Sequence, residues 1–413
     1  MNNTEYAKRN FKAFIWHAIF LSLAQKFMDI NTVIPTMLIQ SGGTPVHLGI
    51  LTAIMVGGNG FMGIFFASFQ THRERKKKYL LTGIYLRVGA LLSMGVVLAY
   101  AGMLAGSVII ASILILMTIF SFSGAFAGIA YNDILGRAID KGSRKNFFIV
   151  KQTLASVGIL ASALLARRAL QLLSYPRNYS VLFLIAGGLL LTATLGFLVI
   201  KENPIEVREQ LSWGKRIKLL KDAFVEDKNL RNYLYLMNMV SIGFAIIPFL
   251  IAFAKTNFGL TSADTGNFLL LQVSGMIVST LIYRFTSKGQ RYKGILTIFI
   301  VSGALLPVLA LAFHGSKVLY FSLFFLSGIV LASRQISLPG ILLEISTDEN
   351  RAIYTGLSGL GSIGVILYPV FAGIVIQYFG YKVIFILTSI LILSSFYFSR
   401  KVICKSFNLS EEE

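Results

Sequence analysis

The apolar positions of this chain fall into twelve long stretches, separated by charged residues or by glycine and proline. A helix that crosses a membrane needs about 20 mostly apolar residues, because each residue adds about 1.5 Å of rise. The pattern therefore predicts an all-α membrane protein with twelve transmembrane helices. The predicted spans are 13–38, 46–70, 79–102, 107–131, 147–170, 179–200, 232–254, 262–286, 294–313, 318–341, 353–377 and 381–400.

Basic residues gather in every second loop between these stretches. With the N-terminus placed in the cytoplasm, 29 of the 38 Lys and Arg residues fall in cytoplasmic segments and 6 fall on the other side. The remaining three, Lys26, Arg87 and Arg334, lie within spans. Because Lys and Arg are enriched in cytoplasmic loops, we expect a multi-pass plasma (inner) membrane protein with both termini inside. The enrichment of Lys and Arg in cytoplasmic loops thus accounts for the net charge of +20, and we expect no nucleic-acid partner.

Composition excludes several other classes of protein. Charged residues make up only 14% of the chain, against about 25% in a soluble domain. The single Cys404 excludes a disulfide framework, and the four histidines are far apart without metal-ligand spacing. The phosphate-binding pattern Gly-x-x-x-x-Gly-Lys-Ser/Thr does not occur. We therefore expect no metal, cofactor or nucleotide, and a solute or ion gradient as the energy source.

A basic loop at 201–231 divides the twelve stretches six and six. Within it, Trp213, Ile217, Leu220 and Phe224 recur at helical spacing among lysines and arginines. This spacing predicts an amphipathic helix along the inner membrane surface. The predicted parts are an N-terminal six-helix half at 1–200, the linker at 201–231 and a C-terminal six-helix half at 232–413.

Three matches between the halves indicate an internal duplication. Pro35 aligns with Pro248 at an offset of 213 residues, and Arg144 aligns with Arg351 at an offset of 207. The third match, at an offset of 214, pairs Gly89-Ala90-Leu91-Leu92 with Gly303-Ala304-Leu305-Leu306. Parallel repeats with a site near the membrane midplane are a transporter architecture.

With these features, the whole chain resembles the major facilitator superfamily of secondary transporters. In the loop after the second span, that family usually has Gly-x-x-x-Asp-Arg-x-Gly-x-Arg/Lys-Arg/Lys. Here Arg73 and the pair Lys77-Lys78 match, but His72 replaces the acid and both glycines are missing. The loops after spans 4 and 10, at 131–148 and 343–356, resemble the family more closely. The Gly-Pro run of the family's antiporters is absent from span 5.

The resemblance implies that charged residues at the cytoplasmic helix ends close the inner gate or bridge the helices. These gating or structural candidates are Arg73, Lys77, Lys78, Asp133, Arg137, Arg144, Glu344 and Arg351.

The first span carries a polar stripe. Ser22, Gln25, Asp29, Thr32 and Thr36 are spaced by 3, 4, 3 and 4 residues, which places them on one face of a continuous helix. Such a face should line an aqueous cavity or the bundle interior. Asp29 is the one acid well inside a span, where a charge costs at least about 2.5–3.5 kcal/mol. It either pairs with Lys26 to hold the span or acts as a protonatable or substrate-contacting carboxylate, and we favour the second interpretation.

Other polar residues within spans have two interpretations each. Arg87 is interpreted as an anchor that reaches the inner interface. Arg334, deep in span 10 beside Gln335, is a candidate for an anionic substrate group or for an interhelical pair. Isolated amides bind a ligand or hold helices together. The substrate or coupling candidates are Asp29, Gln25, Ser22, Thr32, Asn59, Asn238, Gln272, Arg334 and Gln335.

The sequence thus predicts a monomeric secondary active transporter that moves a small solute by alternating access, with proton coupling through Asp29 as one hypothesis. No cluster of catalytic residues is present, so an enzyme is not expected. The alternatives are an efflux pump for drugs or amphiphiles with the same fold, and, from other classes, a lipid flippase or an integral-membrane enzyme.

Overall fold

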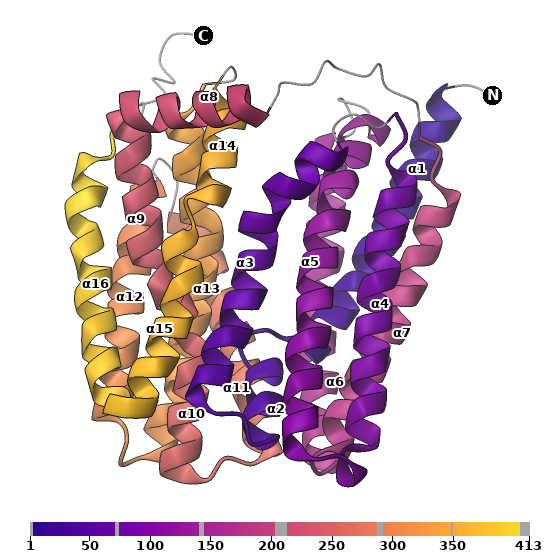
Figure 1. The fold of residues 1–413 in the computed structure, drawn as a ribbon. Coiled ribbons are helices and arrows are strands. Elements are labelled where there is room, and N and C mark those ends of the chain that lie inside the picture. The colour runs from indigo at the N-terminus through magenta and orange to yellow at the C-terminus, as the bar shows by residue number, and fades with distance from the viewer. Residues whose placement is uncertain are drawn as a thin grey trace.

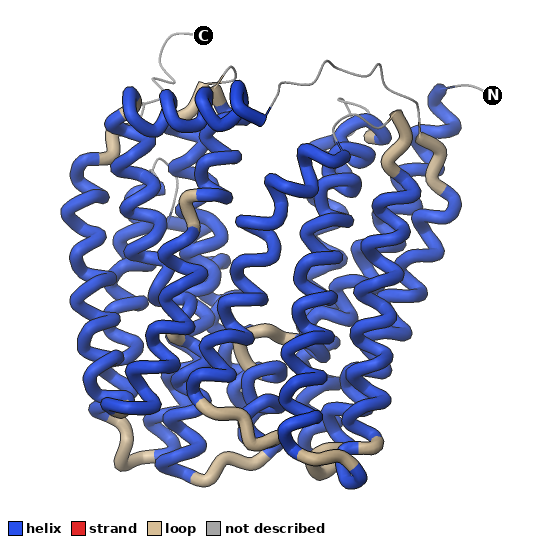
Figure 2. Tube along the Cα trace, in the orientation of Figure 1, coloured by secondary structure: helices blue, strands red, loops and turns tan. Residues whose placement is uncertain are grey.

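A computed structural model of the chain describes residues 3–70, 74–139, 144–202, 213–286, 292–347 and 350–404. Over these ranges the secondary structure is helical, with short turns and no strand (Figure 2). In chain order, the elements of Figure 1 are α1 (Asn3–Gln25), the 3₁₀ turn η1 (Lys26–Met28), α2 (Val33–Gln40), α3 (Pro45–Gln70), α4 (Lys77–Ala99), η2 (Ala101–Met103), α5 (Gly106–Ala138), α6 (Arg144–Leu172), α7 (Arg177–Val199), α8 (Trp213–Glu226), α9 (Lys228–Ala245), α10 (Ile247–Phe258), α11 (Ser262–Thr286), α12 (Tyr292–Ala312), α13 (Lys317–Ile345), α14 (Arg351–Leu360), α15 (Ile363–Phe379) and α16 (Tyr381–Lys401).

Ten helices within the described ranges are long and apolar enough to cross a membrane. Two of the ten are composite, because α9 runs on into α10 and α14 runs on into α15. The two remaining predicted spans are also helical. The first is split between α1 and α2, and the second, α3, contributes only the shorter apolar segment Pro45–Gly58 to the count.

The first span is interrupted, so the continuous helix predicted over 13–38 is wrong. The α-helix ends at Gln25, and α2 begins only at Val33. Proline has no N–H, and its ring clashes with the carbonyl four residues earlier, so Pro35 disfavours helix through Asn31. The side chain of Asp29 then accepts hydrogen bonds from the N–H groups of Asn31 and Thr32, in the turn before α2. The polar stripe is therefore not a single helix face.

The seventh and eleventh spans are interrupted in a similar way. Between α9 and α10 the chain bends at Ile246, and Pro248 occupies the first turn of α10. The two prolines that match between the halves, Pro35 and Pro248, thus both lie where a helix restarts. Between α14 and α15 the break falls at Gly361 and Ser362.

The helices pack into two groups with corresponding neighbours, which we name the N-terminal group (α1 to α7) and the C-terminal group (α9 to α16). In the first, α4 packs on α5 and α7, α1 packs on α7 and α6, and α3 packs on α5. In the second, α12 packs on α13 and α16, α9 packs on α16 and α15, and α11 packs on α13. Figure 1 shows the two groups side by side.

The two groups meet mainly along two helix pairs, α3 with α15 and α6 with α11, and also where α14 packs on α3 and where α10 and α11 pack on α2. Glycines bring the first pair into close contact. A Cβ atom added at Gly49 would collide with the carbonyl oxygen of Pro369, and one added at Gly373 would collide with that of Pro45. Only glycine permits this approach of two backbones, which makes α3 and α15 a tight seam between the groups.

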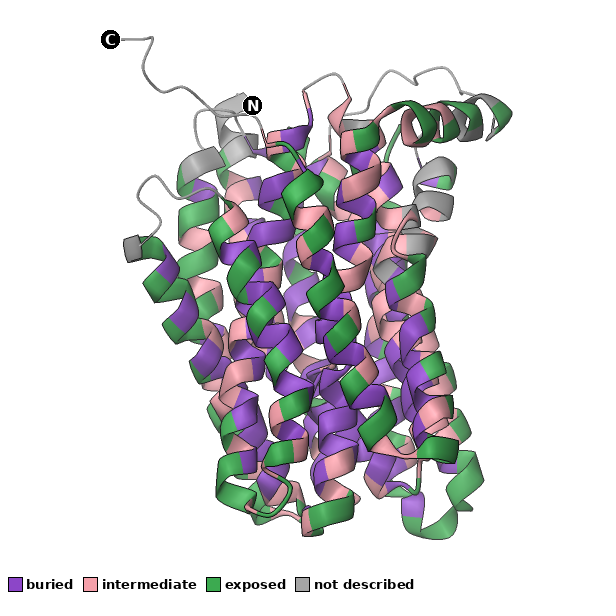
Figure 3. Cartoon of the chain, turned by 90° about the vertical axis from the view of Figure 1, so that its left-hand side faces the viewer, coloured by how far each residue is buried: buried purple, intermediate pink, exposed green. Residues whose placement is uncertain are grey.

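Apolar residues occupy both the interior and much of the outer surface. Figure 3 shows buried and exposed residues alternating along each helix, as expected where one face packs inside and the other faces outward. Exposed large side chains such as Val157, Leu165, Leu367 and Ile390 lie on these outer faces. Such an apolar exterior suits a surrounding of lipid rather than of water.

Helix α8 lies across one end of the C-terminal group, above α9 and α14 (Figure 1). Its Leu220 and Phe224 pack against the core, whereas Leu219 and Val225 are exposed. We call this side of the molecule the α8 end, and α1 begins and α16 finishes there. The other side, where α2 and α10 lie, is called the opposite end.

Candidate functional site

Asp29 lies at the centre of the break in the first span and is buried. Its Oδ2 accepts a hydrogen bond from Lys26 Nζ at 2.6 Å, which also forms an ion pair. Its Oδ1 accepts from the backbone N–H groups of Asn31 and Thr32 at 3.0 Å each, and from the Thr32 hydroxyl at 2.9 Å. The carboxylate thus holds the turn before α2 and neutralises Lys26 at the same time.

The other predicted residues of the first span separate in space. Ser22 is buried and donates to the carbonyl of Ile19, at the point where α1 meets Gly158 of α6. Thr32 is wholly buried in the turn that Asp29 holds. Gln25, in contrast, is exposed. The structure therefore joins Asp29 with Thr32 and leaves Gln25 outside that cluster.

The amide candidates hold helices together. Asn238 donates from Nδ2 to the carbonyls of Leu234 and Gly361, which ties α9 to the break between α14 and α15. Gln272 is fully buried and donates to Ser327, which ties α11 to α13. The side chain of Asn59 lies outside the described residues.

Two arginines inside the membrane-spanning helices have no acidic partner. Arg87 on α4 lies with its guanidinium carbon 4.3 Å from the ring centre of Phe120, and Arg334 on α13 lies 4.5 Å from that of Phe244. Each has a buried Nε without a hydrogen-bond partner. Across the described ranges, no carboxylate lies within ion-pair distance of either guanidinium. Gln335, next to Arg334, is exposed.

At the α8 end of the N-terminal group, four charged residues form a network. Lys76 Nζ lies 2.5 Å from Asp133 Oδ2, and Arg137 Nη2 lies 2.5 Å from the same oxygen. Arg137 also lies 3.5 Å from Glu202 Oε1. Because Lys76 precedes α4, Asp133 and Arg137 are on α5 and Glu202 follows α7, the network joins three spans of one group.

Glu202 also caps α4. Its Oε1 accepts from the backbone N–H of Lys76 at 2.7 Å, and its Oε2 accepts from that of Lys77 at 2.9 Å. The Lys77 ammonium donates in turn to the carbonyls of Leu198 and Ile200 at the end of α7. A carboxylate at a helix N-terminus satisfies free N–H groups and matches the helix dipole.

The remaining gating candidates are Lys78, Glu344, Arg351, Arg73 and Arg144. Lys78 lies over the ring of Tyr79 at 5.1 Å. Glu344 keeps a buried Oε2 without a hydrogen-bond partner. Arg351 begins α14. Arg73 lies outside the described residues, as does the side chain of Arg144.

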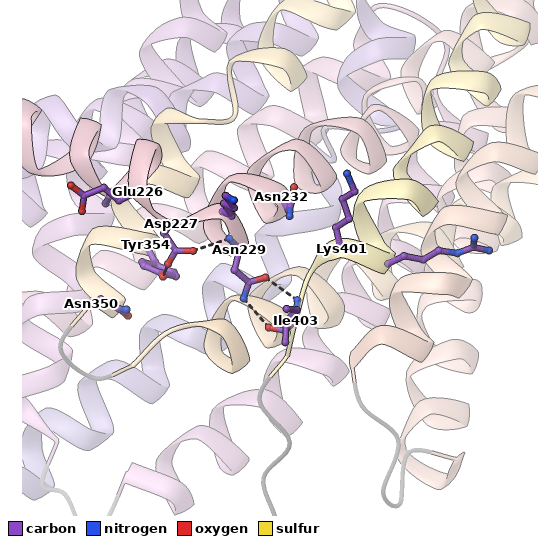
Figure 4. Close-up of a pocket in the computed structure, with 11 residues that line it drawn as sticks. Glu226, Asp227, Asn229, Asn232, Asn350, Tyr354, Lys401 and Ile403 are labelled. Atoms are coloured by element: carbon purple, nitrogen blue, oxygen red, sulfur yellow. Dashed lines mark hydrogen bonds between the residues drawn. The ribbon is translucent and has the colours of Figure 1, made fainter.

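A pocket of about 920 Å³ opens at the α8 end, between α8, α9, α14 and α16 (Figure 4). Asp227 caps α9 from its edge, accepting from two backbone N–H groups and from the Tyr354 hydroxyl. Asn229 exchanges two hydrogen bonds with the backbone of Ile403. These contacts fasten α9 to α14 and to the segment after α16, so the pocket wall is a structural joint.

Hydrogen bonds between the two groups lie at the opposite end. Lys255 Nζ donates to the carbonyl of Ile39 at 2.7 Å, and the Ser262 hydroxyl donates to Gln40 Oε1 at 3.2 Å. The third of these hydrogen bonds runs from Arg167 Nε to Asn267 Oδ1, at 3.0 Å. The groups are thus fastened at the opposite end.

The sequence prediction missed Glu202, Asp227 and Lys255. Asp227 was recognisable, because an Asp directly before a helical apolar pattern is a common N-cap. Glu202 and Lys255 carry no such signal, since their partners are more than 100 residues away in the chain.

Solved transporter structures share this arrangement of helices along nearly the whole chain. One is a bacterial homolog of the human lysosomal transporter Spinster, in an inward-facing and unoccupied conformation (TM-score 0.68, 12% identity, covering 96% of this chain and 97% of that one). Another is the nucleoside transporter NupG (TM-score 0.69, 15% identity, 94% and 99% covered). A third is a POT family transporter in complex with a thioalcohol-conjugated peptide (TM-score 0.68, 13% identity, 95% and 96% covered).

The sequence itself matches the family model of the Major Facilitator Superfamily over residues 233–413. The C-terminal part of the chain thus resembles this superfamily in sequence. The predicted resemblance is thereby confirmed, and the major facilitator fold makes the chain a multi-pass helical membrane protein. A comparison with curated proteins gives no match.

Proposed function

We propose that this protein is a secondary transporter of the major facilitator type that moves a small solute by alternating access between its two groups of six spans. The α8 end faces the cytoplasm, because the segments on that side carry 29 of the 38 basic residues. The solute binds between the groups, and the groups rock about the glycine seam of α3 and α15.

The observation that carries this proposal is the position of the contacts between the groups. Three hydrogen bonds that cross between described parts of the groups lie at the opposite end. At the α8 end, the bonds of Asp133 and of Asp227 stay within one group. Hydrogen bonds between the groups at the opposite end suit a state that is closed toward the outside, which is one of the two states that alternating access requires.

The same proposal includes proton coupling through Asp29 under one condition. Both carboxylate oxygens already accept hydrogen bonds, one from Lys26 and the other from the turn before α2. A proton on Oδ2 would displace the bond from Lys26 and leave that ammonium without its partner. Coupling therefore requires the break in the first span to rearrange during transport.

A reversible lock at the opposite end tests the transport cycle. Cys404 is the only cysteine, so Cys404→Ser gives a background without thiols. In that background, Gln40→Cys with Ser262→Cys replaces a hydrogen bond between the groups by a cross-link. The matched control, Ser41→Cys with Tyr175→Cys, replaces a hydrogen bond of 3.0 Å at the same end but within one group.

The readout uses liposomes that contain the protein and a defined mixture of sugars, nucleosides, amino acids, dipeptides and carboxylic acids. Mass spectrometry follows which solutes cross faster than in protein-free liposomes. We expect the cross-link between the groups to stop this flux, a reductant to restore it, and the control cross-link to leave it unchanged. Flux that persists through the lock, or no flux of any solute above the protein-free level, would contradict the proposal.

A further inference from the structure

The charge balance inside the membrane-spanning helices is positive. Lys26 is neutralised by Asp29 at 2.6 Å. Arg87 and Arg334 have no carboxylate within ion-pair distance, and Lys151 on α6 donates only to the Tyr131 hydroxyl at 3.2 Å. The described part of the interior thus holds two arginines without a counter-charge, and the partly buried Lys151 near the start of α6 is a further cation.

Both arginines are held in place by packing rather than by hydrogen bonds. Phe120 supports the Arg87 guanidinium from one side, and Phe244 supports that of Arg334. A Cβ atom added at Gly124 would lie 3.3 Å from the guanidinium carbon of Arg87, so glycine leaves the room that this group occupies. A guanidinium carries five N–H donors in a fixed plane, and the buried Nε of each arginine has no hydrogen-bond partner among the described residues.

The two guanidinium groups also lie at corresponding places in the two groups. The offsets of 207 and 214 that relate the halves map Arg334 onto the stretch 120–127 of α5. That stretch contains Phe120 and Gly124, the two residues that contact the Arg87 guanidinium. The arginines come from different helices, yet Arg334 starts from the stretch of its group that corresponds to the stretch contacted by Arg87 in the other.

An uncompensated charge in the membrane interior is costly and is retained where it has a function. Arginine is suited to oxyanions, because its fork of donors matches a carboxylate or a phosphate in a bidentate arrangement. Two such forks, one in each group, would both gain an acceptor when a single anionic solute enters between them.

We propose that the solute is an oxyanion, a small molecule with carboxylate or phosphate groups, bound between Arg87 and Arg334, with Lys151 adding to the positive field. This inference rests on the proposed transport function and names its substrate class. It also assigns Arg87, interpreted from the sequence as an anchor, to the binding site.

The first test measures thermal unfolding of the purified protein in detergent with pairs of probes that differ in charge. The pairs are succinate with succinamide, glycerol 3-phosphate with glycerol, and glucose 6-phosphate with glucose. We expect at least one anion to raise the unfolding temperature and its neutral partner to leave it unchanged. The shift should vanish in Arg87→Gln and in Arg334→Gln, shrink in Arg334→Lys, and persist in the control Lys228→Gln, which changes an exposed cation.

The second test needs no ligand. If both arginines lack a counter-charge, Arg87→Met and Arg334→Met should unfold without added anion at the wild-type temperature or above it. Lys26→Met is the matched control, because it removes a paired cation and leaves Asp29 buried alone, so its unfolding temperature should fall.

Three results would overturn the inference: no anion of the three pairs shifts the wild type, the shift survives both Gln variants, or both Met variants unfold well below the wild type. A neutral or cationic solute that crosses the liposome membrane and is stopped by the cross-link would also overturn it, while leaving the transport function intact. Flux that persists when the two groups are cross-linked would instead contradict the proposed transport function itself.

Discussion

At the scale of single residues, Asp29 shows how one side chain serves two purposes. Its Oδ2 neutralises Lys26, and its Oδ1 replaces the hydrogen bonds that an interrupted helix lacks. The sequence offered the pairing as the less favoured of two interpretations, because Lys26 is three residues away. The role in the turn needed the break in the helix, which hydrophobic spacing alone does not reveal.

The first prediction tests the two roles of Asp29, its ion pair with Lys26 and its backbone hydrogen bonds, separately. Asp29→Asn keeps an acceptor for Thr32 but leaves Lys26 buried without a counter-charge, so we expect a loss of about 3–5 kcal/mol of stability. The double change Lys26→Met with Asp29→Asn should recover most of that loss. Thermal unfolding in detergent measures both.

The same double variant decides the coupling hypothesis. If Asp29 carries protons, the variant should fold well, retain downhill flux and lose accumulation against a gradient. Normal uphill accumulation in the double variant would show that Asp29 serves the fold alone.

At the scale of helices, close packing depends on glycines that a pattern of apolar residues does not single out. A Cβ atom at Gly328 of α13 would collide with the carbonyl oxygen of Gln272 on α11, and Gly275 faces Phe325 in the same way. The chain has 37 glycines, and many, such as Gly188 on α7, have open space where a Cβ would go. Sequence alone does not distinguish the two kinds.

The second prediction compares a glycine in close contact with a neighbouring helix and a glycine that has open space where a Cβ atom would go. Gly328→Ala should force α11 and α13 apart and cost about 1–3 kcal/mol, as overpacking does. Gly188→Ala is the control and should leave the unfolding temperature unchanged or raise it slightly, because alanine favours helix. Equal effects of the two changes on thermal unfolding would contradict the close contact.

The third prediction concerns the start of α4. Glu202→Ala removes the acceptor for two backbone N–H groups and should cost about 0.5–2 kcal/mol, the usual loss of a helix cap. Fraying of this first turn should also speed tryptic cleavage after Arg75. The control Glu226→Ala changes an exposed acid on α8. Unchanged cleavage in Glu202→Ala would show that the cap does not hold this turn.

Helix interruptions explain the largest error of the sequence prediction. Pro35 and Pro248 lie where helices restart, but Pro307, Pro339 and Pro369 lie inside continuous helices. A proline therefore weakens a helix without deciding where it ends. In the first span, the adjacent Asp29 supplies the missing acceptor, and this combination of a side-chain acceptor with a proline produces the break.

At the scale of the whole molecule, the all-helical class and ten of the predicted membrane-spanning helices followed from hydrophobic length. The packing of α3 on α15 and of α6 on α11 did not, because it depends on contacts between residues more than 90 positions apart. The orientation in the membrane rests on the distribution of basic residues.

Topology is the fourth prediction. Reporter fusions on the α8 side should report the cytoplasm, because the loops there hold most of the lysines and arginines. Fusions at the opposite end should report the outside. The inside positions are Lys77, Lys215 and Ser410, and the outside positions are Gly43, Gly102 and Lys317. An outside signal at Lys215 would reverse the orientation and with it the side toward which the molecule is closed.

The hydrogen bonds between the two groups at the opposite end have an energetic consequence for the transport cycle. They include three between described residues, and none of these three joins a cation to a carboxylate. A net hydrogen bond contributes about 0.5–1.5 kcal/mol, or about 1.5–3 kcal/mol where one partner is charged. Reversing a two-state population from 1:99 to 99:1 takes about 5.5 kcal/mol. The hydrogen bonds at the opposite end are of the same order, so a ligand that binds the opened state more tightly than the closed one by this free energy is sufficient to open them.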